Sequence, residues 1–326
     1  MMTYDPTILK QHKPLIILTG PTAVGKTATS IGFAKAIGGE IISADSVQVY
    51  RKMDIGSAKI TEKEMDGVPH HLIDILEPDE DFNVMLFQKY AKQAIETIYD
   101  HGHIPIITGG TGFYIQSVLY DIRFEQEEES DIRKKLEAEA KAYGAQYLYE
   151  KLQKVDKEYA DSLHANNVKR VIRALEFYEI NGYPFSRHNK TQRENESPYL
   201  FRYYVLNEPR HVLYERIEQR VDLMVSQGLL QEVTVLKELG YSGDLVSMQG
   251  IGYKDIYSYL KGECTFDEAV YAIKLNTRHF AKRQLTWFRR EKEVVWISKQ
   301  DFSNDTVQIV DYLIKDYETH VGKDLQ

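Results

Sequence analysis

The most constraining feature of this chain is an eight-residue string, GPTAVGKT, at positions 20–27. It fits the pattern G-x-x-x-x-G-K-[ST] completely, and it lies between an apolar segment typical of a buried strand (14–19) and a helix-forming segment (26–37). In such a loop, backbone amides converge on phosphate oxygens and the helix N-terminus adds a favourable dipole. We therefore predict a site for a di- or triphosphate. The motif does not distinguish a nucleotide from another diphosphate. The site is formed by Gly20, Pro21, Thr22, Ala23, Val24, Gly25, Lys26 and Thr27.

Two groups of this loop have chemical roles of their own. Lys26 supplies a point charge to the phosphates, and the Thr27 hydroxyl is the expected protein ligand for Mg²⁺. Magnesium is therefore the cofactor that the loop predicts.

The order of expected elements indicates the fold class. Strands at 14–19, 40–44 and 103–108 alternate with helices at 26–37 and 83–99, which is typical of a parallel sheet with helices on both faces. After about Phe124 the sequence becomes charged, helical and poor in glycine, and a β-like pattern returns only at 200–207. Helices near 209–227, 229–239, 253–260 and 266–292 and a strand at 293–297 follow.

We accordingly predict an α/β fold, a P-loop NTPase-like parallel sheet flanked by helices, with an inserted all-helical domain. The discontinuous core covers residues 1–124 and 200–326, and the insertion covers 125–199.

Charge and composition restrict the class of partner. The net charge of −8 argues by itself against a nucleic-acid partner. However, the segment from His164 to Arg193 contains six Lys/Arg and only two Glu, and the segment from Arg278 to Glu293 contains six Lys/Arg and only two acidic residues. These segments indicate either a polyanion partner or solvated helix faces. The single Cys264 excludes an intramolecular disulfide and a cysteine zinc site. The sequence contains no apolar segment typical of a signal peptide or a transmembrane helix. We therefore expect a cytoplasmic protein that does not bind a membrane, and no obligate protein partner is evident.

Three glycine-rich or polar loops follow the expected strands. Because parallel sheets bind ligands at the carboxyl ends of their strands, loops 20–27, 45–51 and 109–114 should meet. Asp45 is a candidate Mg²⁺ partner, general base or helix cap. In GGTGFY, Thr111 offers a hydroxyl to a phosphate oxygen, although a tight turn explains these glycines equally well. The adjacent His70 and His71 lack further ligands at suitable spacing, so we assign them a structural or supporting role.

Eight segments in a fixed order carry a family resemblance. They are GPTAVGKT, IISADSVQVYRKMDIGSAK, PHHLID, GGTGFY, KRVIRALE, RVDLMVSQGLLQEV, QGIGYKD and TRHFAKRQLTWFRR. Together they strongly resemble the bacterial tRNA dimethylallyltransferases, from about residue 14 to about residue 297.

The resemblance implies a reaction. The N6 of an adenine adjacent to the anticodon in tRNA attacks dimethylallyl diphosphate, and diphosphate leaves. It also implies that Asp45 is the general base and that Lys26, Thr111 and Arg220 support the departing diphosphate, whereas an anonymous arginine at position 220 would more simply form an intrahelical ion pair.

The resemblance further implies contacts with the anticodon stem-loop of tRNA. Gln48 is a candidate hydrogen-bond partner of the purine edge, and Trp287 is either an RNA contact or a packed side chain. The implied RNA-binding residues are Asp45, Ser46, Val47, Gln48, Thr111, Arg133, Lys169, Arg170, Arg173, Gln249, Tyr253, Lys254, Lys282, Arg283, Trp287 and Arg289. Three rival functions remain: an adenylate isopentenyltransferase, a P-loop nucleoside kinase and an RNA-binding NTPase switch.

Overall fold

A computed structural model describes residues 2–124, 131–193 and 195–325. The chain divides into two compact units, and we describe each by itself. The core unit consists of Met1–Leu119 and Ser197–Gln326, and the helical unit consists of Tyr120–Glu196. The helical unit begins and ends a few residues earlier than the predicted insertion, 125–199.

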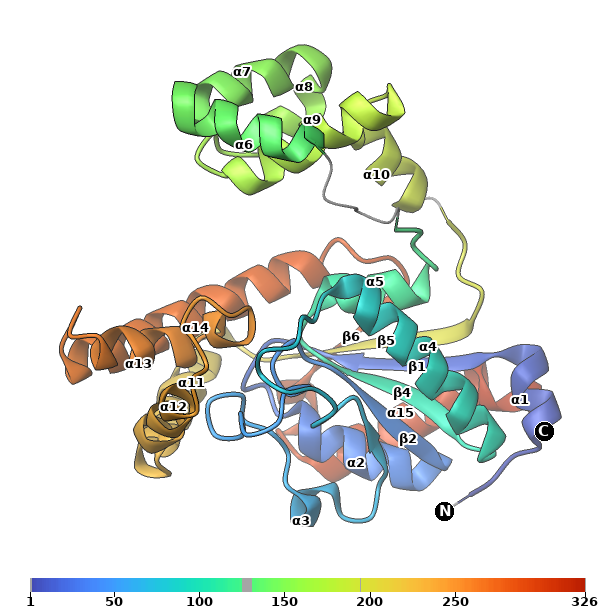
Figure 1. Cartoon of the computed structure of the whole chain (residues 1–326). Coiled ribbons are helices and arrows are strands. Elements are labelled where there is room, and N and C mark those ends of the chain that lie inside the picture. Colours follow the sequence, from blue (N-terminus) through green and yellow to red (C-terminus); the bar gives the residue numbers. More distant parts are fainter. Residues whose placement is uncertain (1, 125–130, 194, 326) are drawn as a thin grey trace. The chain divides into compact units, whose positions relative to one another are not determined.

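Six parallel strands form the sheet of the core unit (Figure 1). Their spatial order is β3-β2-β4-β1-β5-β6. Their bounds are β1 Pro14–Thr19, β2 Gly39–Ala44, β3 His70–His71, β4 Ile104–Gly109, β5 Leu200–Asn207 and β6 Val294–Ser298. This parallel α/β sheet confirms the predicted fold class.

The helices of the core unit cover both faces of this sheet. The chain crosses from β1 to β2 in one direction and from β3 back to β4 in the other, so right-handed crossovers place α2 and α4 on opposite faces. Figure 1 shows α2 and α15 together on one face and α4 on the other. The helices are α1 Pro6–His12, α2 Lys26–Ile37, α3 Glu62–Met65, α4 Val84–Asp100, α5 Gly112–Leu119, α11 Arg210–Ser226, α12 Leu229–Glu238, α13 Tyr253–Leu260, α14 Phe266–Phe288 and α15 Thr306–His320, with 3-10 turns η1 Ser247–Gln249, η2 Lys299–Phe302 and η3 Gly322–Leu325.

Burial on both faces explains the composition of the central strands. Every residue of β1 and β2 is buried, which is why these strands are continuous runs of mostly apolar side chains and do not alternate with polar ones. On the α2 side of the sheet, Phe33 meets Tyr204 and Tyr317 edge-on, at ring-centroid distances of 6.0 and 6.1 Å. These aromatic contacts join α2, β5 and α15 into one core.

In its described residues, 120–124, 131–193 and 195–196, the helical unit contains five helices. They are α6 Asp131–Tyr143, α7 Ala145–Val155, α8 Lys157–Asp161, α9 Val168–Asn181 and α10 Phe185–Arg193. The unit has its own apolar core, formed by Leu136, Leu148, Leu152, Ala160, Val171, Ile172, Ala174 and Leu175. An independent core of this kind is what allows a segment between two sheet strands to be a separate unit.

The structure corrects one predicted helix and adds elements that the sequence did not reveal. The helix predicted at 266–292 ends at Phe288, because residues 289–293 form the turn into β6 and Glu293 takes the left-handed conformation (φ 56°). We did not predict the helices α1, α3, α5, α10 and α15 or the two-residue strand β3. Among the described residues, no helix combines the length and apolarity needed to cross a membrane.

Candidate active site

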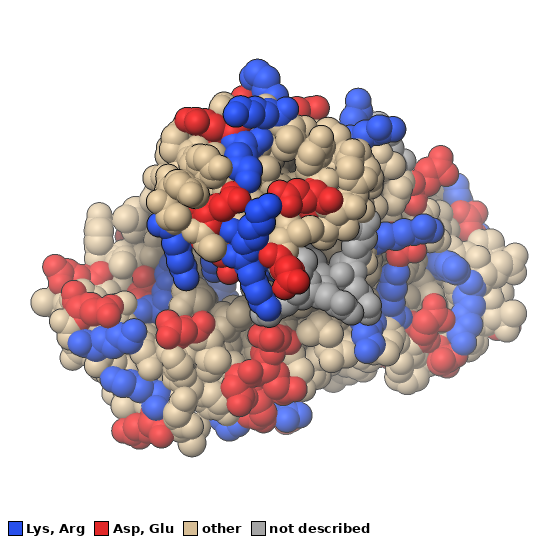
Figure 2. Space-filling model, turned by 45° about the horizontal axis from the view of Figure 1, so that its top comes forward, with Lys and Arg blue, Asp and Glu red and all other residues tan. Residues whose placement is uncertain are grey.

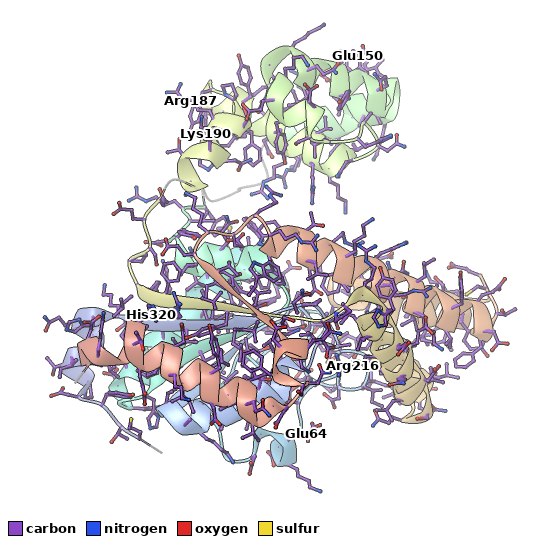
Figure 3. All side chains as sticks on the ribbon, turned by 180° about the vertical axis from the view of Figure 1, so that it is seen from behind. Glu64, Glu150, Arg187, Lys190, Arg216 and His320 are labelled. Atoms are coloured by element: carbon purple, nitrogen blue, oxygen red, sulfur yellow. The ribbon has the colours of Figure 1, made fainter. Side chains whose placement is uncertain are left out.

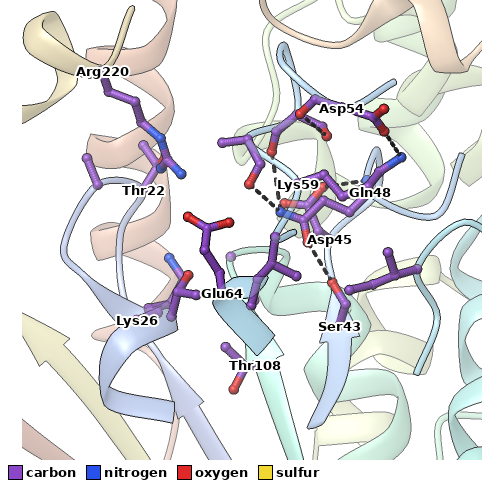
Figure 4. A pocket seen from close by; sticks show the side chains of 18 of the residues that line it. Thr22, Lys26, Ser43, Asp45, Gln48, Asp54, Lys59, Glu64, Thr108 and Arg220 are labelled. Carbon is purple, nitrogen blue, oxygen red and sulfur yellow. Dashed lines mark hydrogen bonds and ion pairs between the residues drawn. The ribbon is translucent and has the colours of Figure 1, made fainter. Parts of the chain in front are cut away.

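The carboxyl ends of three central strands lie level with one another. Gly109 of β4 is in register with Thr19 of β1 on one side and with Ala44 of β2 on the other. The three loops that follow these strands therefore start at the same line, as the sequence predicts. They border a cavity of about 680 Å³ in the core unit. Figure 4 shows Lys26, Asp45, Glu64 and Arg220 around this cavity.

The loop at 20–27 has the backbone conformation that its glycines permit. Gly20, Ala23 and Gly25 all have positive φ, and a Cβ at Gly20 would lie 2.5 Å from the carbonyl oxygen of Leu206. The ammonium group of Lys26 donates to the carbonyl oxygens of Gly20 and Pro21, each at 3.0 Å. The loop therefore curls around its own lysine.

Burial and charge set the protonation of Lys26. Burial is the main cause that lowers the pKa of Lys26, the charge of Arg220 acts in the same direction, and Asp45 opposes both. The resulting pKa is about 7. A bound anion would favour the charged form, so this lysine is well suited to neutralise one.

Two side chains from distant segments hold the phosphate loop from outside. The buried Gln284 of α14 accepts from the amide of Thr22 at 2.8 Å and donates to the carbonyl of Gly110 at 3.0 Å, so it joins two of the three loops. Lys299 donates to the carbonyl of Val24 at 3.1 Å. Sequence reasoning missed both residues. The only available signal for Gln284 was an uncharged amide inside the basic segment 278–292.

Asp45 combines a turn role with a free acceptor. Its Oδ1 accepts from the amides of Val47 (2.8 Å) and Gln48 (3.3 Å), which is the backbone capping that we considered from the sequence. Its Oδ2 makes no hydrogen bond to any residue that the structure describes, and the half-buried carboxylate lines the cavity. The two roles are therefore compatible within one carboxylate.

The side-chain amide of Gln48 is already engaged within the protein. Its Oε1 accepts from the Ser43 hydroxyl at 3.1 Å, and its Nε2 donates to the carbonyls of Ser57 and Ala58 at 3.3 and 3.2 Å. Gln48 lines the cavity, but its side-chain amide is already hydrogen-bonded to Ser43 and to the loop at 53–59. Ser46 next to it is exposed, and Val47 is half-buried.

Glu232 of α12 clamps that same loop. Its carboxylate accepts from the amides of Asp54, Ile55 and Gly56 at 2.9, 2.7 and 3.0 Å and from the hydroxyl of Tyr253 at 2.7 Å. Tyr253 is fully buried, so the structure does not support the predicted RNA contact of its side chain. The segment QEV contains Glu232, but the sequence does not indicate which backbone amides the carboxylate of this glutamate will bind.

Arg220 reaches the cavity from α11. Burial lowers the pKa of Arg220, while the charges of Asp45 and Glu64 raise it. Within the described ranges Arg220 forms no ion pair, so the intrahelical pair that we considered is not made. Its neighbour Arg216 is different, because it binds the buried Glu208 at 2.6 Å. Of the two arginines of α11 that line the cavity, Arg220 is therefore the one without an ion pair among the described residues, and it is available to a ligand.

The end of β4 presents Thr108 to the cavity. Thr108, Gly109 and Gly110 line it, whereas Thr111 lies just past this lining and its amide donates to the carbonyl of Ala44 at 3.3 Å. The hydroxyl of Thr108 is buried and has no hydrogen-bond partner in the part of the chain that the structure describes. An unpartnered buried hydroxyl costs free energy unless a ligand or water satisfies it. Sequence reasoning named Thr111 and passed over Thr108.

The predicted RNA-binding residues of α14 have two different environments. Lys282, Arg283 and Arg289 are exposed. Trp287 packs on the third loop, because a Cβ at Gly112 would lie 2.2 Å from its ring and Phe113 contacts it edge-on at 6.1 Å. The packing alternative for Trp287 is therefore realised in this structure.

Two further candidates lie near α13. Gln249 donates to the carbonyl of Gly243 at 2.6 Å, and Lys254 is half-buried. Neither belongs to the lining of the cavity.

In the helical unit, Lys169, Arg170 and Arg173 are exposed on α9. Arg187 and Lys190 are exposed on α10, where Figure 3 labels them. Arg133 instead binds Glu176 at 2.6 Å, so it is engaged within the unit. On the face drawn in Figure 2, basic and acidic side chains are interspersed, which fits a chain whose net charge is −8.

The fold and this cavity define a class: a P-loop-like α/β protein whose glycine-bearing loop at 20–27 opens at the carboxyl edge of a parallel sheet. A sequence model of the IPP transferase family matches residues 48–291. The chain belongs to that family of transferases.

Named relatives agree with this membership. A tRNA dimethylallyltransferase from Lachnoclostridium phytofermentans is 58% identical over 90% of this chain and 94% of its own. One from Acetivibrio thermocellus is 47% identical over 89% and 93%. The crystal structure of the full-length tRNA isopentenylpyrophosphate transferase of Bacillus halodurans matches with a TM-score of 0.71 and 43% identity over 96% of this chain and 99% of its own. A eukaryotic dimethylallyltransferase acting on tRNA matches with a TM-score of 0.74 and 26% identity over 95% and 77%.

The Glu232 clamp generates a prediction. Glu232→Ala leaves three loop amides and the Tyr253 hydroxyl without their acceptor, so we expect a loss of about 1.5–3 kcal/mol in the free energy of unfolding. Hydrogen exchange at residues 54–56 should accelerate selectively. Glu238→Ala, an exposed glutamate on the same helix, is the matched control and should change neither measurement. Unchanged exchange at 54–56 in Glu232→Ala would contradict the clamp.

Proposed function

We propose that this chain transfers the dimethylallyl group of dimethylallyl diphosphate to the N6 of an adenine adjacent to the anticodon in tRNA and releases diphosphate. The observation that carries the proposal is the single cavity that Lys26, Arg220 and Asp45 share. It combines two cations for a leaving diphosphate with a carboxylate that has a free oxygen. The names of the relatives, tRNA dimethylallyltransferases, support tRNA and this alkyl group as the substrates.

The reaction is a substitution at the allylic carbon. The N6 nitrogen forms a bond to that carbon, the carbon–oxygen bond breaks, and its electron pair leaves with the diphosphate. The N6 proton passes to the free Oδ2 of Asp45, whose Oδ1 stays bound to the amides of Val47 and Gln48 and so keeps the carboxylate oriented. General-base catalysis of this type contributes about 10²–10⁴-fold.

Charge on the leaving group is matched by the phosphate loop and α11. The ammonium of Lys26 exchanges its bonds to the loop carbonyls for phosphate oxygens, and the guanidinium of Arg220 approaches from the other side of the cavity. The buried hydroxyl of Thr108 becomes a third donor. Among the described residues, none of these groups forms an ion pair, so the diphosphate would displace none of the ion pairs that the structure describes.

Magnesium fits the same site. The side chain of Thr27 lines the cavity at the start of α2 and makes no hydrogen bond to the described residues, and a hydroxyl oxygen is a donor that Mg²⁺ accepts. Thr27 would hold the ion together with the diphosphate. When bound, the ion supplies positive charge to the leaving oxygens.

Exposed basic residues lie on α9 in the helical unit and on α14 in the core unit, and each group can contact a macromolecular acceptor. We propose that Lys169, Arg170 and Arg173 contact RNA phosphates near the anticodon stem, and that Lys282, Arg283 and Arg289 contribute to the same acceptor. Contacts of this kind favour tRNA over free adenylate, which needs no such surface.

The direct test incubates the protein and Mg²⁺ with labelled dimethylallyl diphosphate and either unmodified tRNA or AMP. We expect label in RNA, and nuclease digestion should recover it on the N6 of one adenosine next to the anticodon. Label that enters AMP but not tRNA would replace the proposal with adenylate prenyl transfer. Transfer of the γ-phosphate from ATP to a nucleoside would replace it with a kinase.

Asp45→Asn tests the general base. Asparagine keeps an oxygen for the two backbone amides, so the loop should remain intact, but it cannot take the proton. We expect single-turnover transfer with saturating substrates to slow by about 10²-fold or more, with little change in either affinity. Asp311→Asn, on the exposed side of α15, is the control. A rate within about threefold of the parent protein, or full rescue by raised Mg²⁺, would remove this role from Asp45.

The lowered pKa of Lys26 predicts a pH dependence of diphosphate binding. Below pH 7 the free protein already carries the charged lysine, whereas above pH 7 binding must take up a proton. Affinity for pyrophosphate should therefore fall as pH rises above about 7, by up to about tenfold per unit until the pKa in the complex is reached. Titration calorimetry of the parent protein and Lys26→Met measures this, because the ligand's own titration is common to both. Parallel pH profiles for the two proteins would show that Lys26 does not titrate on binding.

The salt dependence of tRNA binding tests the surface of α9. Replacing Lys169, Arg170 and Arg173 by glutamine should weaken binding and lower the slope of log K against log salt by roughly one unit or somewhat less for each phosphate that the protein no longer neutralises. The matched control replaces three exposed lysines of the same unit, Lys135, Lys141 and Lys154. Equal slopes for the two triple variants would show that α9 is not a specific RNA contact.

A further inference from the structure

Three imidazoles converge on one buried carboxylate at the edge of the sheet opposite the cavity. Glu40, near the start of β2, is 1% exposed. The Nδ1 atoms of His101 and His103 lie 2.8 and 2.7 Å from its Oε1, and the Nε2 of His71 lies 2.6 Å from its Oε2. The cluster draws on β2, β3, the end of α4 and the start of β4.

This cluster is separate from the candidate active site. Glu40 and Asp45 lie on the same extended segment, five residues apart, so at about 3.3 Å per residue they are roughly 16 Å apart. The cavity lies at the carboxyl end of β2 and the cluster at the amino end. None of Glu40, His71, His101 and His103 lines the cavity. The transferase chemistry therefore leaves this cluster without a function.

The distances within the cluster are close to those of a metal site. Two ring nitrogens meet at a single oxygen of Glu40, and a third lies against its other oxygen. The ligand atoms of Glu40, His101 and His103 all lie within 4.8 Å of one another. In a tetrahedral zinc site, bonds of about 2.0–2.2 Å put neighbouring ligand atoms about 3.3 Å apart, so the two close contacts need to widen by only about half an ångström.

The backbone between the two histidines is built for this convergence. Gly102 takes the left-handed conformation (φ 72°), and a Cβ at this position would lie 2.6 Å from the carbonyl of Tyr4. Its own carbonyl accepts from the amide of Tyr4 at 2.8 Å. The H-G-H turn is therefore fixed by the N-terminal segment, and it aims both imidazoles at Glu40.

We propose that Glu40, His101 and His103 form a zinc site, with His71 orienting the carboxylate through its second oxygen. Two imidazole nitrogens and one carboxylate are a donor set that suits Zn²⁺ and does not suit the hard ions Mg²⁺ and Ca²⁺. The His71 contact supplies the hydrogen bond that metal-binding carboxylates normally receive. The site binds a divalent transition-metal ion and ties β2 to the segment that joins α4 to β4.

Access from solvent is consistent with this assignment. The side chain of His101 is 51% exposed, which gives an ion a path from solvent and leaves room for water as the fourth ligand.

Metal titration of the full chain tests the site. Protein stripped with a chelator should bind one Zn²⁺ per chain in calorimetry, and Co²⁺ should give the visible absorption of a tetrahedral complex. Bound Zn²⁺ should raise the midpoint of thermal unfolding, since it binds the folded state. A hundredfold excess of Mg²⁺ should neither compete nor stabilise. Folded protein that shows no Zn²⁺ heat and no Co²⁺ spectrum would overturn the proposal.

Single variants locate the ion. His101→Ala is the first choice because this side chain is half exposed, and it should lower Zn²⁺ affinity at least about 100-fold, as should His103→Ala. His71→Phe should cost about 10–100-fold, because it removes only the hydrogen bond to the carboxylate. His211→Ala, an exposed histidine on α11, is the control and should bind as the parent does. Zn²⁺ affinity that survives in a folded His101→Ala, His103→Ala double variant would place the metal elsewhere and contradict the assignment.

Discussion

The level ends of β1, β2 and β4 are the constraint on which the rest of this structure depends. Because Gly109 pairs in register with both Thr19 and Ala44, three loops must leave the sheet at one line. The backbone amides and side chains of these loops therefore lie within one small volume. The glycine-bearing loop at 20–27, a capping aspartate and a buried threonine hydroxyl, all distant in sequence, thereby border one cavity. The chemistry of the site follows from the parallel pairing of strands.

Loops that start together still need to be held, and helices from the second half of the chain hold them. Gln284 bonds the phosphate loop to the loop after β4, and Lys299 supports the carbonyl of Val24. Glu232 gathers three amides of the loop at 54–56, and that loop in turn engages Gln48. Each contact satisfies backbone groups that a loop cannot satisfy by itself. Contacts within the protein therefore hold the loops that border the cavity, and fixed groups of this kind are what transition-state stabilisation requires.

The two ends of β2 show how environment assigns different roles to like groups. Asp45 at the carboxyl end is half-buried, caps a turn with one oxygen and leaves the other facing the cavity. Glu40 near the amino end is fully enclosed by histidines. The first arrangement suits proton transfer and the second suits holding a cation. Net charge is a poor guide to either, because Lys26 and Arg220 make a local cationic site in a chain whose net charge is −8.

The sequence by itself determined the elements whose signals are local. A complete phosphate-loop pattern between a strand and a helix defines a turn that only glycine-rich backbone can make, and apolar runs without alternation indicate strands buried on both faces. These signals led to the α/β class, the three meeting loops and the strand at 200–207 in its correct position.

Only the tertiary structure decided which side chains complete the site. No local sequence pattern identifies Gln284, Glu232 or Thr108. Gln284 and Glu232 bind backbone groups that only the fold brings close, and only the fold buries the Thr108 hydroxyl beside the cavity. The same reason explains why Tyr253 is a buried support for Glu232, and why His71, which has no ligand partner at suitable sequence spacing, lies beside Glu40 with two other histidines. Sequence spacing reports on neighbours within one element, whereas contacts between elements depend on sheet order and register, which the chain settles only when it packs.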